Sequence, residues 1–181
     1  EWRPYGCRLR EFCGREGPAC LSRYKTVAVA GDSIARELFD EVGSVMLQRD
    51  VSWREIFPHK HASGSREVNG TMIKMMWIPD PLATITQHLQ GPIQLREQYT
   101  KTDLLIISAG YWYIYRTSQE AFLEGVRNLT AAVSQTLGGR TQVVWVTIPA
   151  GWMNFGYRIR PRIENWNMAA ARIVAEAGWT V

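Results

Sequence analysis

The sequence predicts an α/β domain in which helices cover both faces of a central parallel sheet. Short apolar or β-branched runs alternate with longer stretches of helical period, and Gly, Pro and Asp residues separate them. The chain has 181 residues, of which 46% are hydrophobic and 21% are charged, so it can bury one sizeable core. We therefore interpret residues 1–181 as a single domain.

The first strand and the helix after it are clearly marked. Residues 26–30 form an uninterrupted apolar run, as expected of a strand buried on both faces. Apolar residues then recur at threes and fours over residues 33–48, which predicts an amphipathic helix. The turn between strand and helix is Gly31-Asp32-Ser33.

Further strands and helices alternate along the rest of the chain. Strands are expected at 71–78, 103–108 and 142–148, and a fifth begins at 179–181. A helix with a capping-box sequence at 117–120 should end at Gly138-Gly139, and another should run from about Ile163 to Gly178. With right-handed crossovers, this order predicts a three-layer αβα domain of flavodoxin-like type, whose ligand site lies at the carboxyl ends of the strands.

Charge and hydropathy exclude some classes of partner. The formal net charge of +4 comes from scattered Lys and Arg without a basic block among aromatics, which argues against nucleic acid but permits weak attraction to anionic sugars. No apolar run approaches the ~18 to 20 residues needed to cross a bilayer. The chain opens on Glu1-Trp2-Arg3-Pro4 rather than on a signal peptide, so we expect it to be mature or excised from a longer protein.

Cysteines and sequons favour an oxidising compartment. Cys7, Cys13 and Cys20 precede the first strand without a CxxC pair or a nearby histidine, so no metal site is expected. A Cys7–Cys20 disulfide would tie down an N-terminal arm of residues 1–25 and leave Cys13 free or paired outside the chain. Asn69 and Asn128 each begin a glycosylation sequon.

Ser33 occupies a position suited to a nucleophile. A serine on a tight turn between a buried strand and a helix exposes its hydroxyl, and N–H groups of the helix N-terminus can stabilise an oxyanion. The alternative is structural: Gly31 makes the turn, and Asp32 or Ser33 caps the helix. Taken alone, the tripeptide favours the structural interpretation, since short motifs often match by chance.

The residues around Ser33 change that balance, because they resemble a known family. The segments are WRPYGCRL (residues 2–9), then Cys20, then VAVAGDSIAREL (residues 27–38). They resemble the start of the PC-esterase family, a branch of the GDSL/SGNH hydrolase superfamily. That branch includes trichome birefringence-like polysaccharide O-acetyltransferases of plants, lumenal domains of animal sialic acid O-acetyltransferases and related fungal capsule acetyltransferases. The likeness continues through residues 72–79, 108–112, 143–145 and 167–170, and so covers nearly the whole chain.

The resemblance implies an SGNH-hydrolase fold and roles for single residues. Ser33 would be the nucleophile that takes the acetyl group, and its own backbone N–H would be one oxyanion donor. Asp32 and Arg36 would complete the motif; the alternative for Arg36 is an ordinary surface or ion-paired residue. Gly110 would support the oxyanion by letting the backbone approach the site, with Tyr111 and Trp112 beside it as substrate-binding residues. The superfamily's usual asparagine is absent from this block, which leaves the second oxyanion group open.

The largest departure from the family is at the end of the chain. Family members complete a triad with a D-x-x-H pair after the fifth strand, and no such pair occurs in these 181 residues. Because a serine without a base is a weak nucleophile, we expect the chain to stop before its catalytic Asp and His and to be nearly inactive alone. His59, His61 and His88 all precede the third strand; His59 and His61 fit a solvated loop better than a metal site.

Aromatic residues are abundant in the expected strand-end loops. Flat rings stack on sugars, which suits a carbohydrate acceptor. The loop residues are Trp112, Tyr113, Tyr115, Trp152 and Tyr157. For Trp77, Trp145 and Trp166 we expect core packing instead.

The function expected from these residues is O-acetyl transfer through an acetyl-serine to a carbohydrate hydroxyl. No bound cofactor is expected, and the acetyl donor, for which acetyl-CoA is a candidate, would be a co-substrate. Two alternatives stay open: a carbohydrate acetylesterase that uses water at the same serine, and a glycan-binding domain without catalysis. The resemblance also implies the Golgi lumen, or secretion as the alternative, with membrane-spanning segments only in a longer protein.

Overall fold

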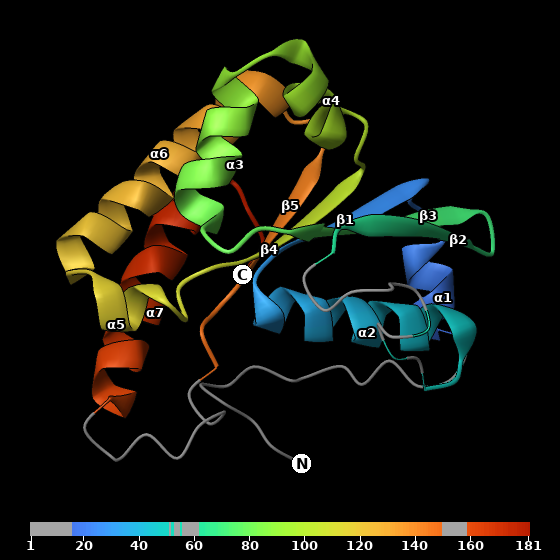
Figure 1. Cartoon of the computed structure of the whole chain (residues 1–181), viewed down its shortest axis with the longest axis horizontal. Helices are drawn as coiled ribbons and strands as arrows, with labels where there is room; N and C mark the ends of the chain where they lie inside the picture. The colour runs from blue at the N-terminus through green and yellow to red at the C-terminus, as the bar shows by residue number, and fades with distance from the viewer. Residues whose placement is uncertain (1–15, 51, 53–54, 56–61, 150–158) are drawn as a thin grey trace.

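The computed structural model describes residues 16–50, 52, 55, 62–149 and 159–181, and it is an α/β structure with one five-stranded sheet (Figure 1). The strands are β1 (Thr26–Gly31), β2 (Gly64–Val68), β3 (Thr71–Trp77), β4 (Leu104–Ser108) and β5 (Gln142–Val146). The helices are α1 (Glu16–Leu21), α2 (Ser33–Leu47), α3 (Pro81–Gln90), α4 (Ile93–Thr100), α5 (Tyr113–Arg116), α6 (Gln119–Leu137) and α7 (Arg160–Glu176). The predicted α/β class with a largely parallel sheet is confirmed.

The strand order is β2-β3-β1-β4-β5, with β1 in the centre. β3, β1, β4 and β5 are parallel, and β2 is antiparallel to β3 at one side. Beyond β5, Thr180 forms a parallel bridge with Val144, so the fifth parallel strand begins where the sequence predicts it. The C-termini of these four parallel strands therefore lie at one edge of the sheet, which we call its carboxyl end. Their N-termini lie at the opposite edge, which we call its amino end.

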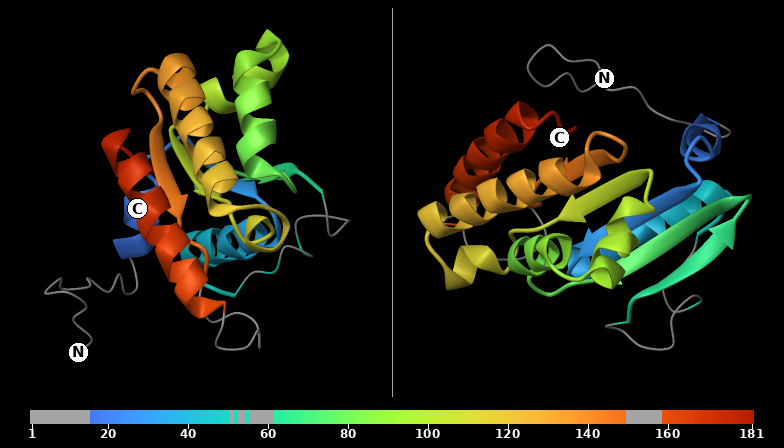
Figure 2. Two further views of the ribbon diagram at one scale, coloured as in Figure 1. Left: turned by 90° about the vertical axis from the view of Figure 1, so that its left-hand side faces the viewer. Right: turned by 90° about the horizontal axis from the view of Figure 1, so that it is seen from above.

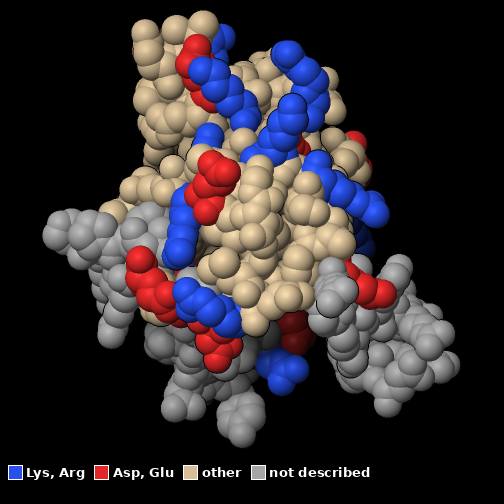
Figure 3. Space-filling model, turned by 90° about the vertical axis from the view of Figure 1, so that its right-hand side faces the viewer, with Lys and Arg blue, Asp and Glu red and all other residues tan. Residues whose placement is uncertain are grey.

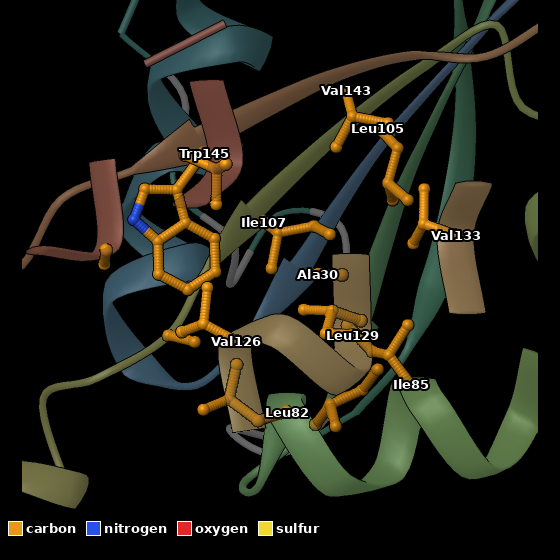
Figure 4. Packing of buried hydrophobic residues seen from close by; sticks show 14 of the residues in the cluster. Ala30, Leu82, Ile85, Leu105, Ile107, Val126, Leu129, Val133, Val143 and Trp145 are labelled. Atoms are coloured by element: carbon orange, nitrogen blue, oxygen red, sulfur yellow. The ribbon is translucent and has the colours of Figure 1, made fainter. Parts of the chain in front are cut away.

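Helices lie on both faces of the sheet (Figures 1 and 2). Val27 and Val29 of β1 belong to the apolar cluster that α2 covers, whereas the alternate residues Ala28 and Ala30 belong to the cluster beneath α3, α6 and α7. Successive strand residues point to opposite faces, so β1 must be apolar throughout. Figure 4 shows the larger cluster, in which strand residues such as Ile107 and Trp145 meet Leu82 of α3 and Val126 of α6.

Three predicted helices are confirmed, with small shifts at their ends. α6 is capped by Ser118, whose Oγ accepts the N–H of Ala121 at 3.2 Å, and it ends at the left-handed Gly138. α2 spans the predicted range up to its left-handed C-cap, Gln48. α7 carries the predicted apolar face, with Ile163 and Trp166 buried. Within the described residues, no helix is both long and apolar enough to cross a membrane.

The sequence prediction missed β2, α1, the two helices after β3 and the short α5. β2 and β3 form a hairpin whose turn is Asn69-Gly70, with φ of 52° and 81°. Both positive φ values match the type I′ turn, for which Asn-Gly is the preferred pair. At Pro79-Asp80-Pro81, the chain begins α3 rather than a loop, because the Asp80 side chain accepts the N–H of Ala83 at 3.4 Å and Pro81 fits the first helical turn. β5 also ends at Val146, two residues earlier than predicted.

Candidate active site at the carboxyl end of the sheet

Ser33 lies where β1 passes into α2, at the carboxyl end of the sheet. It is the first residue of α2 and is partly exposed, whereas its neighbours Asp32 and Ile34 are buried. The strand is held by parallel neighbours on both sides, so the turn that carries Ser33 is fixed by the centre of the sheet.

Asp32, not Ser33, caps α2. The Asp32 carboxylate Oδ1 accepts the N–H of Ile34 at 3.0 Å, and its carbonyl oxygen accepts the N–H of Arg36 at 3.1 Å. The Ser33 N–H, at the first helical position, has no intrahelical acceptor by helix geometry. The capping alternative therefore applies to Asp32 and leaves the Ser33 hydroxyl available for other chemistry.

Asp32 is only 2% exposed, and this burial raises the pKa of its carboxyl group. The hydrogen bond from Ile34 and the nearby charge of Arg36 act in the opposite direction. Burial prevails because a carboxylate loses hydration when it is removed from water. Asp32 thus brings a weakly acidic group directly beside the candidate nucleophile.

Gly31 lets three strands approach one another at this turn. Its φ is +146°, and a Cβ here would collide with the carbonyl oxygen of Ser108 in β4 and lie 2.9 Å from the Cβ of Ala35. On the other side, the Gly31 carbonyl oxygen accepts the N–H of Ile78 at 2.9 Å. A glycine is therefore required for the close contact of β1 with β4, as the tight-turn interpretation expects.

Gly110 follows β4 and is also required by packing. Its φ is +125°, and a Cβ would lie 2.5 Å from Cδ1 of Ile148. Ile148 is in turn held by Asn167 of α7, which accepts its N–H at 2.9 Å and donates to its carbonyl oxygen at 2.8 Å. Close packing with Ile148 thus accounts for Gly110, and the expected oxyanion role of Gly110 stays a prediction.

Tyr111 and Trp112 lie beside this glycine, as predicted. Tyr111 is buried, and burial raises its pKa, with smaller contributions from Tyr115 and from the Asp32 carboxylate. Trp112 is 40% exposed, but the Arg116 guanidinium lies 5.2 Å above its ring centroid. One face of Trp112 is therefore covered, which limits its use as a stacking platform for sugars.

A small cavity of about 150 Å³ adjoins these aromatic residues. Asp80, Trp112 and Arg116 are among the residues that line it, and the Tyr113 hydroxyl donates a hydrogen bond to Asp80 Oδ1. This volume is smaller than the ~300–1,000 Å³ of typical ligand pockets, so the cavity is sized for one compact group of a substrate. The sequence prediction missed Asp80 because it took the Pro-Asp-Pro segment as a strand stop only.

Arg36 is buried rather than on the surface. It is 8% exposed, and its guanidinium carbon lies 5.6 Å from the ring centroid of Trp77 at the end of β3. The surface alternative for Arg36 is therefore wrong. Arg36 instead brings the start of α2 against the end of β3, where Trp77 is half-buried and packs against the apolar cluster that α2 covers.

Several predicted residues lie away from Ser33. His88 of α3 forms a hydrogen bond of 3.0 Å with the buried Tyr99, which assigns it a packing role. Trp145 and Trp166 are buried in the core, as predicted. Within the described residues, no group of three His, Cys, Asp or Glu side chains could hold a metal ion. Other predictions fall outside the described residues: Cys7, Cys13, His59, His61, Trp152 and Tyr157.

The predicted modification sites differ in their surroundings. Cys20 is exposed on α1, and its pairing with Cys7 stays a prediction. Asn69 is exposed in the hairpin turn, where its Nδ2 donates to the carbonyl oxygen of Met46 at 3.1 Å. Asn128 is exposed on α6. Glycosylation of Asn69 would thus compete with a hydrogen bond of the fold, whereas no such bond restrains Asn128 among the described residues.

Comparisons with protein-family models, with curated proteins and with solved structures each find no match. The fold is therefore established by its own geometry, and the function has to be inferred from the residues at the carboxyl end of the sheet. Of these, the structure brings Asp32, Ser33, Arg36, Gly110 and Tyr111 to the ends of adjacent strands.

Proposed function

We propose that this protein is an SGNH-type, PC-esterase-like O-acetyltransferase that moves an acetyl group through Ser33 to a carbohydrate hydroxyl. The observation that supports this most directly is that Asp32, and not Ser33, caps the start of α2. Asp32 satisfies the helix N-terminus, so the Ser33 hydroxyl and N–H are left at the carboxyl end of the sheet. Open α/β sheets bind their ligands at this end.

The strand order is consistent with the proposed fold. Among the parallel strands, the second, first, third and fourth in sequence lie side by side, which is the flavodoxin-like order. In this arrangement the turn after β1 faces the ends of β3 and β4. Ser33 would thus meet a substrate flanked by the β3–α3 turn with Asp80 and the β4–α5 turn with Tyr111.

In the first step, Ser33 Oγ attacks the carbonyl carbon of an acetyl donor such as acetyl-CoA. The Ser33 proton passes to a base, and the tetrahedral oxyanion is stabilised by the Ser33 N–H and the positive end of α2. The intermediate collapses to acetyl-serine, and the donor's leaving group departs with the proton. By the family resemblance the base would be the histidine of a D-x-x-H pair, and no such pair occurs in these 181 residues.

In the second step, a sugar hydroxyl attacks the acetyl-serine carbonyl and gives its proton to the same base. Ser33 then leaves, which regenerates the enzyme and yields the acetylated sugar. Water at the same position would give the acetylesterase reaction instead. The small cavity bordered by Asp80, Trp112 and Arg116 lies in the turns that follow β3 and β4, at the same end of the sheet as Ser33, and supports binding of a compact polar group there.

The proposed setting is the secretory pathway, with the Golgi lumen favoured over secretion. Cys20 is exposed and so can form a disulfide in an oxidising compartment, and Asn128 is exposed and so can carry a glycan. Co-expression with oxidising and non-oxidising folding machinery, followed by non-reducing peptide mapping, would test the Cys7–Cys20 pair.

The function is tested with the natural protein, extended to include any residues that follow Val181. The protein is incubated with acetyl-CoA or a simple acetyl ester and analysed by peptide mass spectrometry. An acetyl adduct on Ser33 is the expected result, and it should be absent from Ser33→Ala. Ser65→Ala is the matched control, because Ser65 is exposed on the edge strand β2.

Adding candidate sugars then separates the proposed reactions. Acetylated sugar formed at the expense of free acetate supports transfer, whereas acetate alone identifies an esterase. A folded, extended protein that forms no adduct with either donor contradicts the nucleophile assignment. Sugar binding without an adduct would then identify the glycan-binding alternative.

A further inference from the structure

The amino end of the sheet holds a second cavity, on the opposite side of the domain from Ser33. Its volume is about 680 Å³, within the range of pockets that hold small molecules. Its walls come from the residues just before β1 and β4, from the start of β5 and from the ends of α6 and α7. The charged, polar and aromatic side chains of its lining include Arg23, Lys25, Asp103, Arg140, Gln142 and Trp179.

Three cationic side chains line this cavity and have no anionic partner in the described part of the chain. Arg23, Lys25 and Arg140 are exposed and form no ion pair with any described residue. Asp103 is the acidic residue in the lining, and its Oδ2 already accepts the N–H of Thr26 at 2.8 Å. Figure 3 shows Lys and Arg side chains gathered over the upper part of the face at the amino end of the sheet.

Basic residues often stabilise the C-termini of helices, and both α6 and α7 end at this cavity. Here, however, the terminal carbonyl groups bond to backbone N–H groups. Leu137 O accepts from Arg140 N at 3.1 Å, and Val174 O accepts from Trp179 N at 3.0 Å. The cationic side chains are thus not needed to cap these two carbonyl groups.

The balance of charge remains positive when the helix ends are included. Each helix C-terminus is equivalent to about half a negative charge, so two ends and Asp103 contribute about −2 against three cations. A net charge of about +1 therefore remains at the mouth of the cavity. Arginine is suited to phosphate because its planar guanidinium can donate two parallel hydrogen bonds.

The rest of the lining suits an uncharged portion of a ligand. Tyr24 donates its hydroxyl to Gln142 Oε1 at 2.6 Å, which fixes the amide and leaves its NH₂ group as a donor. Val133, Leu137 and Trp179 provide an apolar wall. The cavity thus combines a cationic mouth with a polar donor and an apolar wall.

We propose that this cavity binds a phosphorylated small molecule of about nucleotide size. The phosphate would lie between Arg23, Lys25 and Arg140, and the uncharged portion would lie against the apolar wall beside Gln142. This site is independent of the proposed acetyl transfer, because it uses none of the residues at the carboxyl end of the sheet.

The test is isothermal titration of the purified protein with adenosine diphosphate and with inorganic pyrophosphate at about 0.15 M salt, where long-range attraction is screened. Both probes should bind, adenosine diphosphate more tightly. Arg140→Gln should weaken binding about tenfold or more, as loss of a charged hydrogen bond does. Arg127→Gln is the matched control, because Arg127 is exposed on the same helix, α6, but does not line the cavity.

Each other outcome overturns the proposal. Equal weakening by Arg127→Gln and Arg140→Gln would show attraction to general surface charge. Equal affinity for the two probes would exclude a contribution from the apolar wall. Absence of binding by either probe at about 10 mM, a concentration that detects even millimolar affinity, would exclude the site. The melting temperature of each variant, measured without ligand, verifies that the protein is folded.

Discussion

The two ends of the sheet differ in how their residues are held. At the carboxyl end, backbone contacts fix nearly every functional candidate: Gly31 touches β4, Asp32 caps α2 and Asn167 binds the loop after β5. At the amino end, Arg23, Lys25 and Arg140 extend into an open cavity without ion-pair partners among the described residues. The residues at the carboxyl end are thus held by contacts with the backbone, whereas the amino end is marked by charged side chains that no ion pair holds in place among the described residues.

Sequence patterns are more informative at the carboxyl end than at the amino end. Tight backbone contacts demand particular residues at particular positions, such as glycine where a Cβ would collide, and so they leave short motifs. A cavity lined by residues from five separate segments leaves no motif, because no local pattern relates Arg23 to Arg140. Substitutions at the carboxyl end should therefore destabilise the protein most where a backbone contact is lost.

Gly31→Ala should lower the free energy of unfolding by about 4 kcal/mol, from a collision of the new Cβ with Ser108 and from strained backbone. Urea denaturation followed by circular dichroism measures this. Gly70→Ala is the control: its φ is also positive, at +81°, but nothing lies within 4 Å of the added Cβ. It should cost about 1 kcal/mol. Similar losses in the two variants would show that strand contact at Gly31 is unimportant.

Asn167→Leu should lower the free energy of unfolding by about 2 kcal/mol, because both backbone groups of Ile148 lose their partner. The loss should also loosen the contact of Ile148 with Gly110, seen as faster amide exchange around Gly110. Asn165→Leu makes the same chemical change at an exposed position of α7. If Asn165→Leu destabilises the protein equally, the effect comes from helix composition and not from the hydrogen bonds to Ile148.

Asp32→Ala should lower the free energy of unfolding by about 1 kcal/mol, the usual value of a helix N-cap. Ser33→Ala should change it by less than about 0.5 kcal/mol, because the Ser33 side chain is not the cap of α2. Thermal and urea denaturation of both variants measure the contrast. If Ser33→Ala lowered the free energy of unfolding more than this, Ser33 would have a structural role, and the assignment of Ser33 as nucleophile would lose support.

Much of the sheet could be predicted because buried parallel strands need continuous apolar runs. β1 and β4 follow this rule, and α6 could be predicted from its capping serine and its glycine stop. β2 (Gly64–Val68, GSREV) has no such run, because it is an edge strand with alternating exposure. Its turn, Asn69-Gly70, was the available signal, but it was interpreted only as a sequon.

At the candidate site, sequence predicted positions better than roles. Ser33, Asp32 and Gly110 lie at strand ends, as the motif implied. The division between Asp32 as cap and Ser33 as free hydroxyl depends on side-chain direction, which the tripeptide does not encode. The burial of Arg36 against Trp77 joins residues 41 positions apart, and no local pattern relates them.

The smallest expected effect is a pH dependence that isolates the burial of Asp32. Because the pKa of Asp32 is raised in the folded protein, the folded state binds the proton more tightly than the unfolded state does. This contribution to stability is fully present below the unfolded value of 3.8 and is lost as the pH rises through the raised pKa. Asp32→Asn keeps an oxygen that can cap α2 but does not titrate.

The measured quantity is the difference in free energy of unfolding between the wild type and Asp32→Asn across this pH range. Relative to the variant, the wild type should lose stability as the pH rises from 3.8, and the difference should then become constant. A difference that instead grows in favour of the wild type would mean that the Ile34 hydrogen bond and the Arg36 charge outweigh burial. Asp32 would then be an ordinary ionised cap, and the carboxyl end would be held by charge as well as by backbone contacts.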